Sequence, residues 1–301
     1  MSGSDWLAER FERNRGHLRA VAYRMLGSAT EADDAVQETW LRLSRSDVSG
    51  VENLGGWLTT VAARVCLDML RARSSRREEP LEEQAPESPA MAARKIDPEQ
   101  EAVLADAVGA ALLVVLDRLE PAERLAFVMH DMFAVPFEEI APIVGRTADA
   151  ARQLASRARR RVHGAAAGGS ASTNANLPEQ RRTVEGFIRA LRAGDFEGLL
   201  AMLDPDVVVR IDAAAGRPGA GPREVHGARN WARGAIAFSR TVRLAFVEPA
   251  LVDGVVGLVL ARRGRLFRVL RFRFEQGKIA QVDILADPEN LEKVEVRLLE
   301  D

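Results

Sequence analysis

The sequence has almost no cysteine and no long apolar run. Its 301 residues include one cysteine, Cys66, which excludes an internal disulfide framework and a metal site built from several cysteines. No apolar run is long enough to cross a bilayer, and the N-terminus turns polar and acidic within five residues, unlike a signal peptide. We therefore expect a cytoplasmic protein that makes no contact with a membrane.

A strong net charge is also missing. The chain carries 42 Lys and Arg against 44 Asp and Glu, a formal net charge of −2, which argues against a protein that is basic throughout. The charges are nevertheless segregated along the chain. Residues 78–101 are acidic and proline-bearing, without helical periodicity, and are predicted to be a linker. A chain of this length favours two or three domains.

The most informative pattern is a pair of short helices near the middle of the chain. Residues 136–144 are predicted to form the first helix and 147–163 the second, with Gly145 in the turn and Thr147 as N-cap. The second helix combines a narrow apolar stripe with an arginine-rich face. This is the helix-turn-helix pattern, whose second helix enters a major groove. A plain arginine-rich surface helix remains the alternative, and Pro142 weakens the pattern.

Three helices are predicted before the acidic stretch, over 5–26, 31–44 and 55–73. The second has an acidic face that lacks the usual basic partners at i+4, so it suits docking onto a basic partner, although simple solubility is the alternative. The third ends in clustered arginines and follows a polar loop, 45–54. That arrangement fits contact with nucleic acid, whereas capping of the helix C-terminus is the other interpretation.

Several segments resemble the extracytoplasmic-function (ECF) sigma factors. Region 2 of that family is matched by 22–28 (AYRMLGS), 31–43 (EADDAVQETWLRL) and 57–71 (WLTTVAARVCLDMLR). Region 4 is matched by 119–124 (LEPAER), 137–141 (FEEIA) and 152–159 (RQLASRAR). The resemblance spans about 5–163 in the family's order and spacing. It implies that the chain binds core RNA polymerase and promoter DNA.

The resemblance also implies a role for particular side chains. Those expected to bind core polymerase are Asp33, Asp34, Gln37 and Glu38. Those expected at the −10 element are Asn53, Trp57, Arg64, Asp68, Arg71 and Arg73. Those expected at the −35 element are Thr147, Arg152, Gln153, Ser156, Arg157 and Arg160. The acidic linker is expected to thread near the RNA path of the polymerase.

The C-terminal third changes periodicity after a small-residue linker. Two helices are predicted over 179–193 and 195–203, followed by a curled antiparallel sheet in an α+β arrangement. The predicted strands are 206–211, 242–247, 255–262, 266–274 and 278–285. The segments 192–196, 203–209 and 287–291 resemble the SnoaL-like, cone-shaped domain of sigma-J-like sigma factors. The full chain is thus expected to contain two all-α sigma domains plus an α+β SnoaL-like domain.

The predicted domain boundaries are 1–77 for region 2, 78–101 for the acidic linker, 102–165 for region 4, 166–178 for the flexible linker and 179–301 for the SnoaL-like domain. Four residues of that last domain are candidates for a pocket or an interdomain contact: Asp212, Arg217, His226 and Trp231. An Asp–His pair there could serve general acid–base chemistry. We favour a regulatory module without catalytic residues, metal or cofactor, whose small-molecule ligand, if any, is unknown.

Two alternatives from other classes remain open at this point. The first is a SnoaL-type enzyme or ligand-binding protein with a vestigial sigma module. The second is a DNA-binding regulator that acts without polymerase, for which an acidic helix over 31–38 has no obvious use. The favoured hypothesis is a sigma factor in which the C-terminal domain makes intramolecular contacts that tune its activity.

Overall fold

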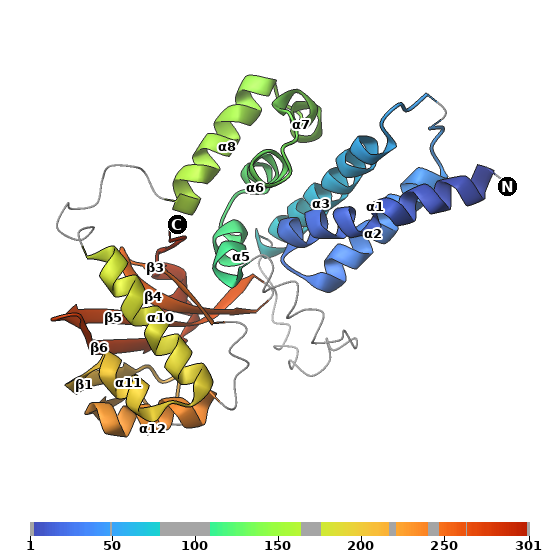
Figure 1. Cartoon of the computed structure of the whole chain (residues 1–301). Coiled ribbons are helices and arrows are strands. Elements are labelled where there is room, and N and C mark those ends of the chain that lie inside the picture. The colour runs from blue at the N-terminus through green and yellow to red at the C-terminus, as the bar shows by residue number, and fades with distance from the viewer. Residues whose placement is uncertain are drawn as a thin grey trace. The chain divides into compact units, whose positions relative to one another are not determined.

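The computed structural model describes residues 3–48, 50–78, 109–163, 176–216, 221–239, 247–262 and 264–299 (Figure 1). The chain forms two compact units. The first comprises Met1–Leu104 and Leu116–Arg161, and the second comprises Ala105–Val115 and Val162–Asp301. The predicted acidic linker, apart from Glu78, and most of the predicted flexible linker lie outside the described residues.

The first three helices of the first unit pack around a shared apolar core. They are α1 (Gly3–Leu26), α2 (Ala29–Ser44) and α3 (Leu54–Glu78), and they match the predicted helices to within a few residues. The predicted start of the second helix at residue 31 is two residues late, because Ser28 is the N-cap of α2 and accepts a hydrogen bond from Glu31 N at 3.5 Å. Cys66 is buried, and burial raises the pKa of its thiol to about 12, as expected for a core residue.

Most residues of the later helical elements belong to this unit too, but residues 110–115 and 162–163 belong to the second unit. These elements are α5 (Ala110–Asp117), α6 (Pro121–Phe127), the π-helix η1 (Val128–Met132), α7 (Phe137–Val144) and α8 (Ala148–His163). Helix α6 continues directly into the π-helical turn η1. The predicted turn chemistry is confirmed. Gly145 adopts a left-handed conformation with φ 69°, and the Thr147 hydroxyl accepts a hydrogen bond from Ala150 N at 3.2 Å.

The second unit is built on a mixed, seven-stranded sheet with the order β2-β1-β6-β5-β4-β3-β7. Its strands are β1 (Leu203–Ile211), β2 (Arg223–His226), β3 (Val247–Val252), β4 (Val255–Arg262), β5 (Arg265–Glu275), β6 (Lys278–Leu285) and β7 (Val296–Arg297). The predicted all-antiparallel sheet is wrong at one place, because β1 and β6 are parallel. The strand predicted over 242–247 is observed later, from Val247, and its earlier residues lie outside the described ones.

Helices cover the sheet of the second unit on one face, α10 (Leu177–Ala193), α11 (Phe196–Met202) and α12 (Ala228–Ser239), as Figure 1 shows. The short helix α13 (Pro288–Lys293) follows β6. The core joins the aromatic rings of Phe187, Trp231 and Phe272, and the first two stack with centroids 5.4 Å apart. A mixed sheet with helices packed on one face agrees with the α+β arrangement that the sequence predicts.

Candidate nucleic-acid interface

Helix α8 presents a polar stripe opposite its buried face. Ala151, Ala155 and Ala158 are fully buried, as the apolar period predicts. The exposed stripe on the other side of the helix comprises Asp149, Arg152, Gln153, Ser156 and Arg160. Because these positions recur at helical spacing, they share one face that a DNA groove could meet.

Two buried or half-buried acids hold the flanks of α8 in place. Glu123 of α6 accepts from Arg157 Nε at 2.9 Å and from Arg161 Nη1 at 2.8 Å, although the Glu123 side chain is only 5% exposed. On the other flank, Asp131 accepts from Arg159 Nε at 2.8 Å. The flanking arginines therefore orient the helix. Of the predicted −35 residues, Arg157 is one of these orienting arginines, and Arg152 forms an ion pair with Asp149.

Helix α3 divides the predicted −10 residues between two faces. Trp57, Arg64, Asp68 and Arg71 recur at i, i+7, i+11 and i+14 and so lie on one face, where the last three are exposed. Asn53 precedes the helix, and its Oδ1 accepts from Gly56 N at 3.0 Å, which fixes the helix start. Arg73 points to the other side of α3 and is only 23% exposed.

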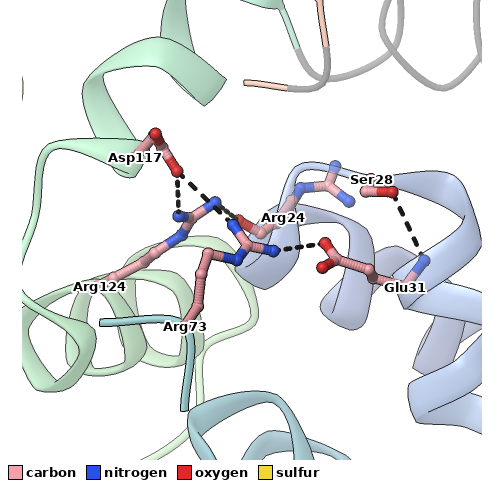
Figure 2. A network of polar contacts seen from close by, with 6 residues as sticks. All are labelled: Arg24, Ser28, Glu31, Arg73, Asp117 and Arg124. Atoms are coloured by element: carbon pink, nitrogen blue, oxygen red, sulfur yellow. Dashed lines mark hydrogen bonds and ion pairs between the residues drawn. The ribbon is translucent and has the colours of Figure 1, made fainter. Parts of the chain in front are cut away.

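Arg73 belongs to a polar network that joins region 2 to region 4 within the first unit (Figure 2). It pairs with Glu31 of α2, and its Nη1 lies 3.9 Å from Asp117 Oδ1 at the end of α5. Arg124 of α6 contacts the same carboxylate at 3.5 Å and donates to the Arg24 carbonyl at 3.3 Å. Arg124 is 2% exposed, and burial lowers its pKa to about 10 in spite of Asp117.

The acidic side of α2 is less free than its sequence predicts. The expectation of no basic partner at i+4 is wrong for Glu38, which accepts from Arg42 Nε at 2.9 Å. Asp33 is paired as well, with Arg19 of α1 at 2.7 Å. Both carboxylates keep about half of their surface exposed, 57% for Asp33 and 44% for Glu38. Asp34 and Gln37 are exposed beside them, so all four candidates remain accessible to a partner.

The structure separates the Asp–His pair considered for the C-terminal domain. His226 pairs with Val208 across β1 and β2, whereas Asp212 lies four residues beyond Val208, about 13 Å along the strand. Asp212 accepts hydrogen bonds from Ala215 N, Ala286 N and Asp287 N at 2.6, 2.7 and 2.9 Å. Burial alone raises its pKa, but these backbone donors lower it below the ordinary value.

The other two candidates of this domain differ in placement. Trp231 lines an apolar cavity of about 170 Å³ in the second unit, and Arg217 lies outside the described residues. His226 is 69% exposed at the end of β2. Asp212 thus ties the end of β1 to the segment after β6, which is a structural role that the sequence pattern does not reveal.

Comparison with known proteins connects both units to one family. A family model described as Sigma-70 region 2 matches residues 10–76, and one described as Sigma-70, region 4 matches residues 109–162. The probable ECF RNA polymerase sigma factor SigI of Mycobacterium tuberculosis is 34% identical over 99% of both chains. The chain belongs to the ECF RNA polymerase sigma factors. SigJ of the same organism is 35% identical, over 93% of this sigma factor and 91% of SigJ.

One solved structure aligns with most of the chain. The crystal structure of the Mycobacterium tuberculosis ECF sigma factor SigJ aligns over 95% of this sigma factor and 98% of SigJ, at 30% identity and a TM-score of 0.43.

In the described part of the chain, no helix is both long and apolar enough to span a membrane, and no group of three or more His, Cys, Asp or Glu side chains is placed to hold a metal.

Sequence reasoning missed three charged residues that the structure withdraws wholly or partly from solvent. Glu123 and Arg124 lie inside the region 4 segment 119–124, and both are buried. A charged pair of neighbours within an apolar helix is the signal that could have found them, since unpartnered charges are rarely buried. Arg268 of β5 has no such signal, because its partners come from distant parts of the sequence.

Proposed function

We propose that this sigma factor directs core RNA polymerase to promoters by reading the −35 element with the exposed stripe of α8. The observation that supports this most directly is the division of the α8 side chains. Helix α8 carries five arginines and one glutamine, and its three flanking arginines, Arg157, Arg159 and Arg161, are tied to Glu123 and Asp131. Gln153, Ser156 and Arg160 stay exposed at the centre. Arg and Gln side chains are suited to reading guanine and adenine in a major groove.

The −10 element is assigned to the exposed face of α3. Arg64 and Arg71 are exposed on the same side as Trp57, so two cations and one aromatic ring lie along one face of the helix. This combination suits a melted strand, because the arginines contact phosphates and the ring offers a stacking surface. Arg73 is not part of this surface in the packed state, since Glu31 and Asp117 bind it.

Core polymerase is assigned to the acidic side of α2. Asp34 and Gln37 are exposed, and the neighbouring Asp33 and Glu38 retain about half their surface beside their arginine partners. A basic surface on the polymerase could compete for these exposed pairs, because each is worth less than about 1 kcal/mol.

Promoter binding in this proposal requires region 2 and region 4 to separate. The −10 and −35 elements are by their names about 25 base pairs apart, roughly 85 Å of B-form DNA at about 3.4 Å per base pair. The network of Arg73, Asp117 and Arg124 instead holds the two regions in direct contact. Holoenzyme formation therefore shifts the chain from this packed state to an open one.

Control by the C-terminal domain is supported by two hydrogen bonds within the second unit, one to a side-chain carboxylate and one between backbone groups. Glu248 of β3 accepts a hydrogen bond from Ala111 N at 2.9 Å, at the start of α5, and Leu298 N donates to Val162 O at 3.0 Å, at the end of α8. The second unit therefore includes the first residues of one region 4 helix and the last residues of another. We infer that it biases how readily region 4 leaves the packed state.

The test combines core binding with transcription. Full-length chain is applied to core RNA polymerase on a sizing column, and promoter-dependent transcripts are measured in parallel. Asp34→Lys/Glu38→Lys should abolish co-elution, whereas Asp206→Lys/Glu292→Lys, which makes the same charge change on exposed acids of the second unit, should co-elute normally. Co-elution that survives the first variant, or that is lost equally in both, would contradict the proposed core-binding side of α2.

DNA reading and C-terminal control have their own variants. Arg160→Ala should weaken transcription from a cognate −35 element without lowering the melting temperature, whereas Arg161→Ala, on the Glu123 flank, should affect both. Glu248→Gln should change transcript yield without changing core binding. Unchanged yield with Glu248→Gln would argue against control through the start of α5.

A further inference from the structure

The second unit contains an apolar cavity that no promoter or polymerase role uses. It measures about 170 Å³ and lies between α10, α12 and the curved sheet, with walls that include Phe187, Trp231, Phe238 and Leu258. An apolar cavity of about 150 Å³ holds one benzene molecule. The cavity is therefore large enough for a single small ring.

Two arginines line this cavity, Arg223 of β2, which is exposed, and Arg268 of β5. Arg268 of β5 lines it and is half-buried, and its guanidinium carbon lies 4.4 Å from the centroid of the Phe238 ring. Its Nη2 donates to the Ala215 carbonyl at 3.1 Å. Its Nε is buried and has no hydrogen-bond acceptor among the described residues.

Asp212, the acid whose charge acts on Arg268, does not accept a hydrogen bond from Arg268 Nε. The negative charge of Asp212 stabilises the charged form of Arg268 electrostatically, but the Asp212 oxygens accept their hydrogen bonds from three backbone amides. Burial consequently lowers the pKa of Arg268 in spite of the favourable effect of Asp212. A buried cationic donor beside empty apolar space is stabilised most by an anionic acceptor.

We propose that this cavity binds a small, mostly apolar monocarboxylate. The hydrocarbon ring packs against Trp231 and Phe187, and the carboxylate accepts a hydrogen bond from Arg268 Nε. A neutral hydrocarbon fills the same space but leaves the donor unsatisfied. A second carboxylate has to be buried against the leucine and phenylalanine walls, which disfavours a dianion.

One strand, β3, forms part of the cavity wall and also contacts the start of region 4. Val247 lines the cavity, and the next residue, Glu248, accepts the hydrogen bond from Ala111 N. A ligand in the cavity that packs against Val247 therefore contacts the strand whose Glu248 holds the start of α5. The binding site itself does not depend on the promoter role, so its test needs neither DNA nor polymerase.

The experiment measures binding of 4-fluorobenzoate to the full-length chain by ¹⁹F NMR, with neutral 4-fluorobenzyl alcohol as the matched probe. The benzoate should bind at least about tenfold more tightly than the alcohol. Arg268→Met keeps an apolar stem over Phe238 and should remove this preference, whereas Arg268→Lys should keep part of it. Arg271→Gln is the control, because Arg271 lies on the same strand but pairs with Asp253 and Asp283.

A cavity-filling variant separates binding in the cavity from binding to surface arginines. Ala235 lines the cavity on α12, and Ala235→Leu should abolish binding of both probes while the melting temperature stays near that of the parent. Equal affinity for the two probes overturns the proposal. It is also overturned if benzoate binding persists in Ala235→Leu, if Arg268→Met and Arg271→Gln behave alike, or if neither probe binds the parent chain.

Discussion

Two arginines withdrawn from solvent, Arg124 in the first unit and Arg268 in the second, have opposite surroundings. Arg124 is 2% exposed and contacts Asp117 and the Arg24 carbonyl. Arg268 has one carbonyl acceptor, and it lines a cavity. Both have a buried Nε without an acceptor among the described residues, so that feature alone does not distinguish them. The cavity does.

The difference shows what each charge can do. Around Arg124 the space is filled by helices of region 2 and region 4, so the charge links parts of the chain to each other. Arg268 lines a cavity, so its charge is available to a ligand that enters that cavity. A buried charge that is fully packed serves the fold, and one that borders a cavity can serve binding.

The largest effect is expected from removing the acid beside Arg124. Asp117→Asn leaves two arginines, Arg73 and Arg124, without their shared carboxylate, and should lower the free energy of unfolding of the first unit by about 2–3 kcal/mol. Arg124→Met removes the buried charge itself and relieves its repulsion from Arg73, so it should cost less than Asp117→Asn. Chemical denaturation of both variants checks the order, and a larger loss for Arg124→Met would contradict this account.

A smaller effect is expected from the acid near Arg268. Asp212→Asn loses at least one acceptor for three backbone amides and should destabilise the second unit by about 1–2 kcal/mol. Because the folded state lowers the pKa of Asp212, its contribution is complete above the ordinary value of 3.8 and is lost as pH falls through the lower, folded value. Acid titration of stability should show a shallower loss below pH 3.8 in Asp212→Asn than in the parent.

Arg268→Met should change stability less than either acid substitution. Only the Ala215 carbonyl loses a donor, and the methionine stem keeps its contact with Phe238, so the loss should stay within about 1 kcal/mol. Thermal melting of the full-length chain measures it. A loss as large as that of Asp117→Asn would mean that Arg268 is a structural residue like Arg124, and the contrast between the two arginines would disappear.

The sequence predicts what depends on local periodicity. The buried stripe of α8, the Thr147 cap and the bounds of β6 all follow from neighbouring residues and are confirmed. The position of Arg73 on the far side of α3 also follows from helical spacing, but grouping the basic residues by sequence proximity placed it with Arg71. Proximity along a helix is a poor guide to a shared face.

What the sequence does not predict depends on distant partners. β2 and β7 are short, and β2 carries mainly polar residues, so neither has a clear strand pattern. The parallel pairing of β1 with β6 joins segments about seventy residues apart in the sequence. The hydrogen bonds from Ala286 N and Asp287 N to Asp212 span a similar separation. No local pattern specifies such contacts, and the Asp–His hypothesis failed for that reason.

The smallest effect concerns a titratable group at the contact between region 2 and region 4. His17 of α1 lies 3.2 Å from Thr59 Oγ1, its ring meets the Phe133 ring edge-on at 5.3 Å, and Glu139 lines the same hollow. Burial lowers the pKa of His17 below its ordinary value of 6.5. The unfolded chain therefore takes up a proton first, and stability present above pH 6.5 is lost as pH falls through the folded value.

His17→Gln keeps a polar partner for Thr59 but cannot gain that charge, so it should flatten the decline in stability of the first unit below pH 6.5. Hydrogen exchange of Phe133 and its neighbours, followed from pH 7 to pH 5, measures the local effect. Faster exchange at low pH in the parent but not in His17→Gln would place the titration at this contact. An equal increase in both would assign it to another group and leave the Arg124 network as the main polar tie between the two regions.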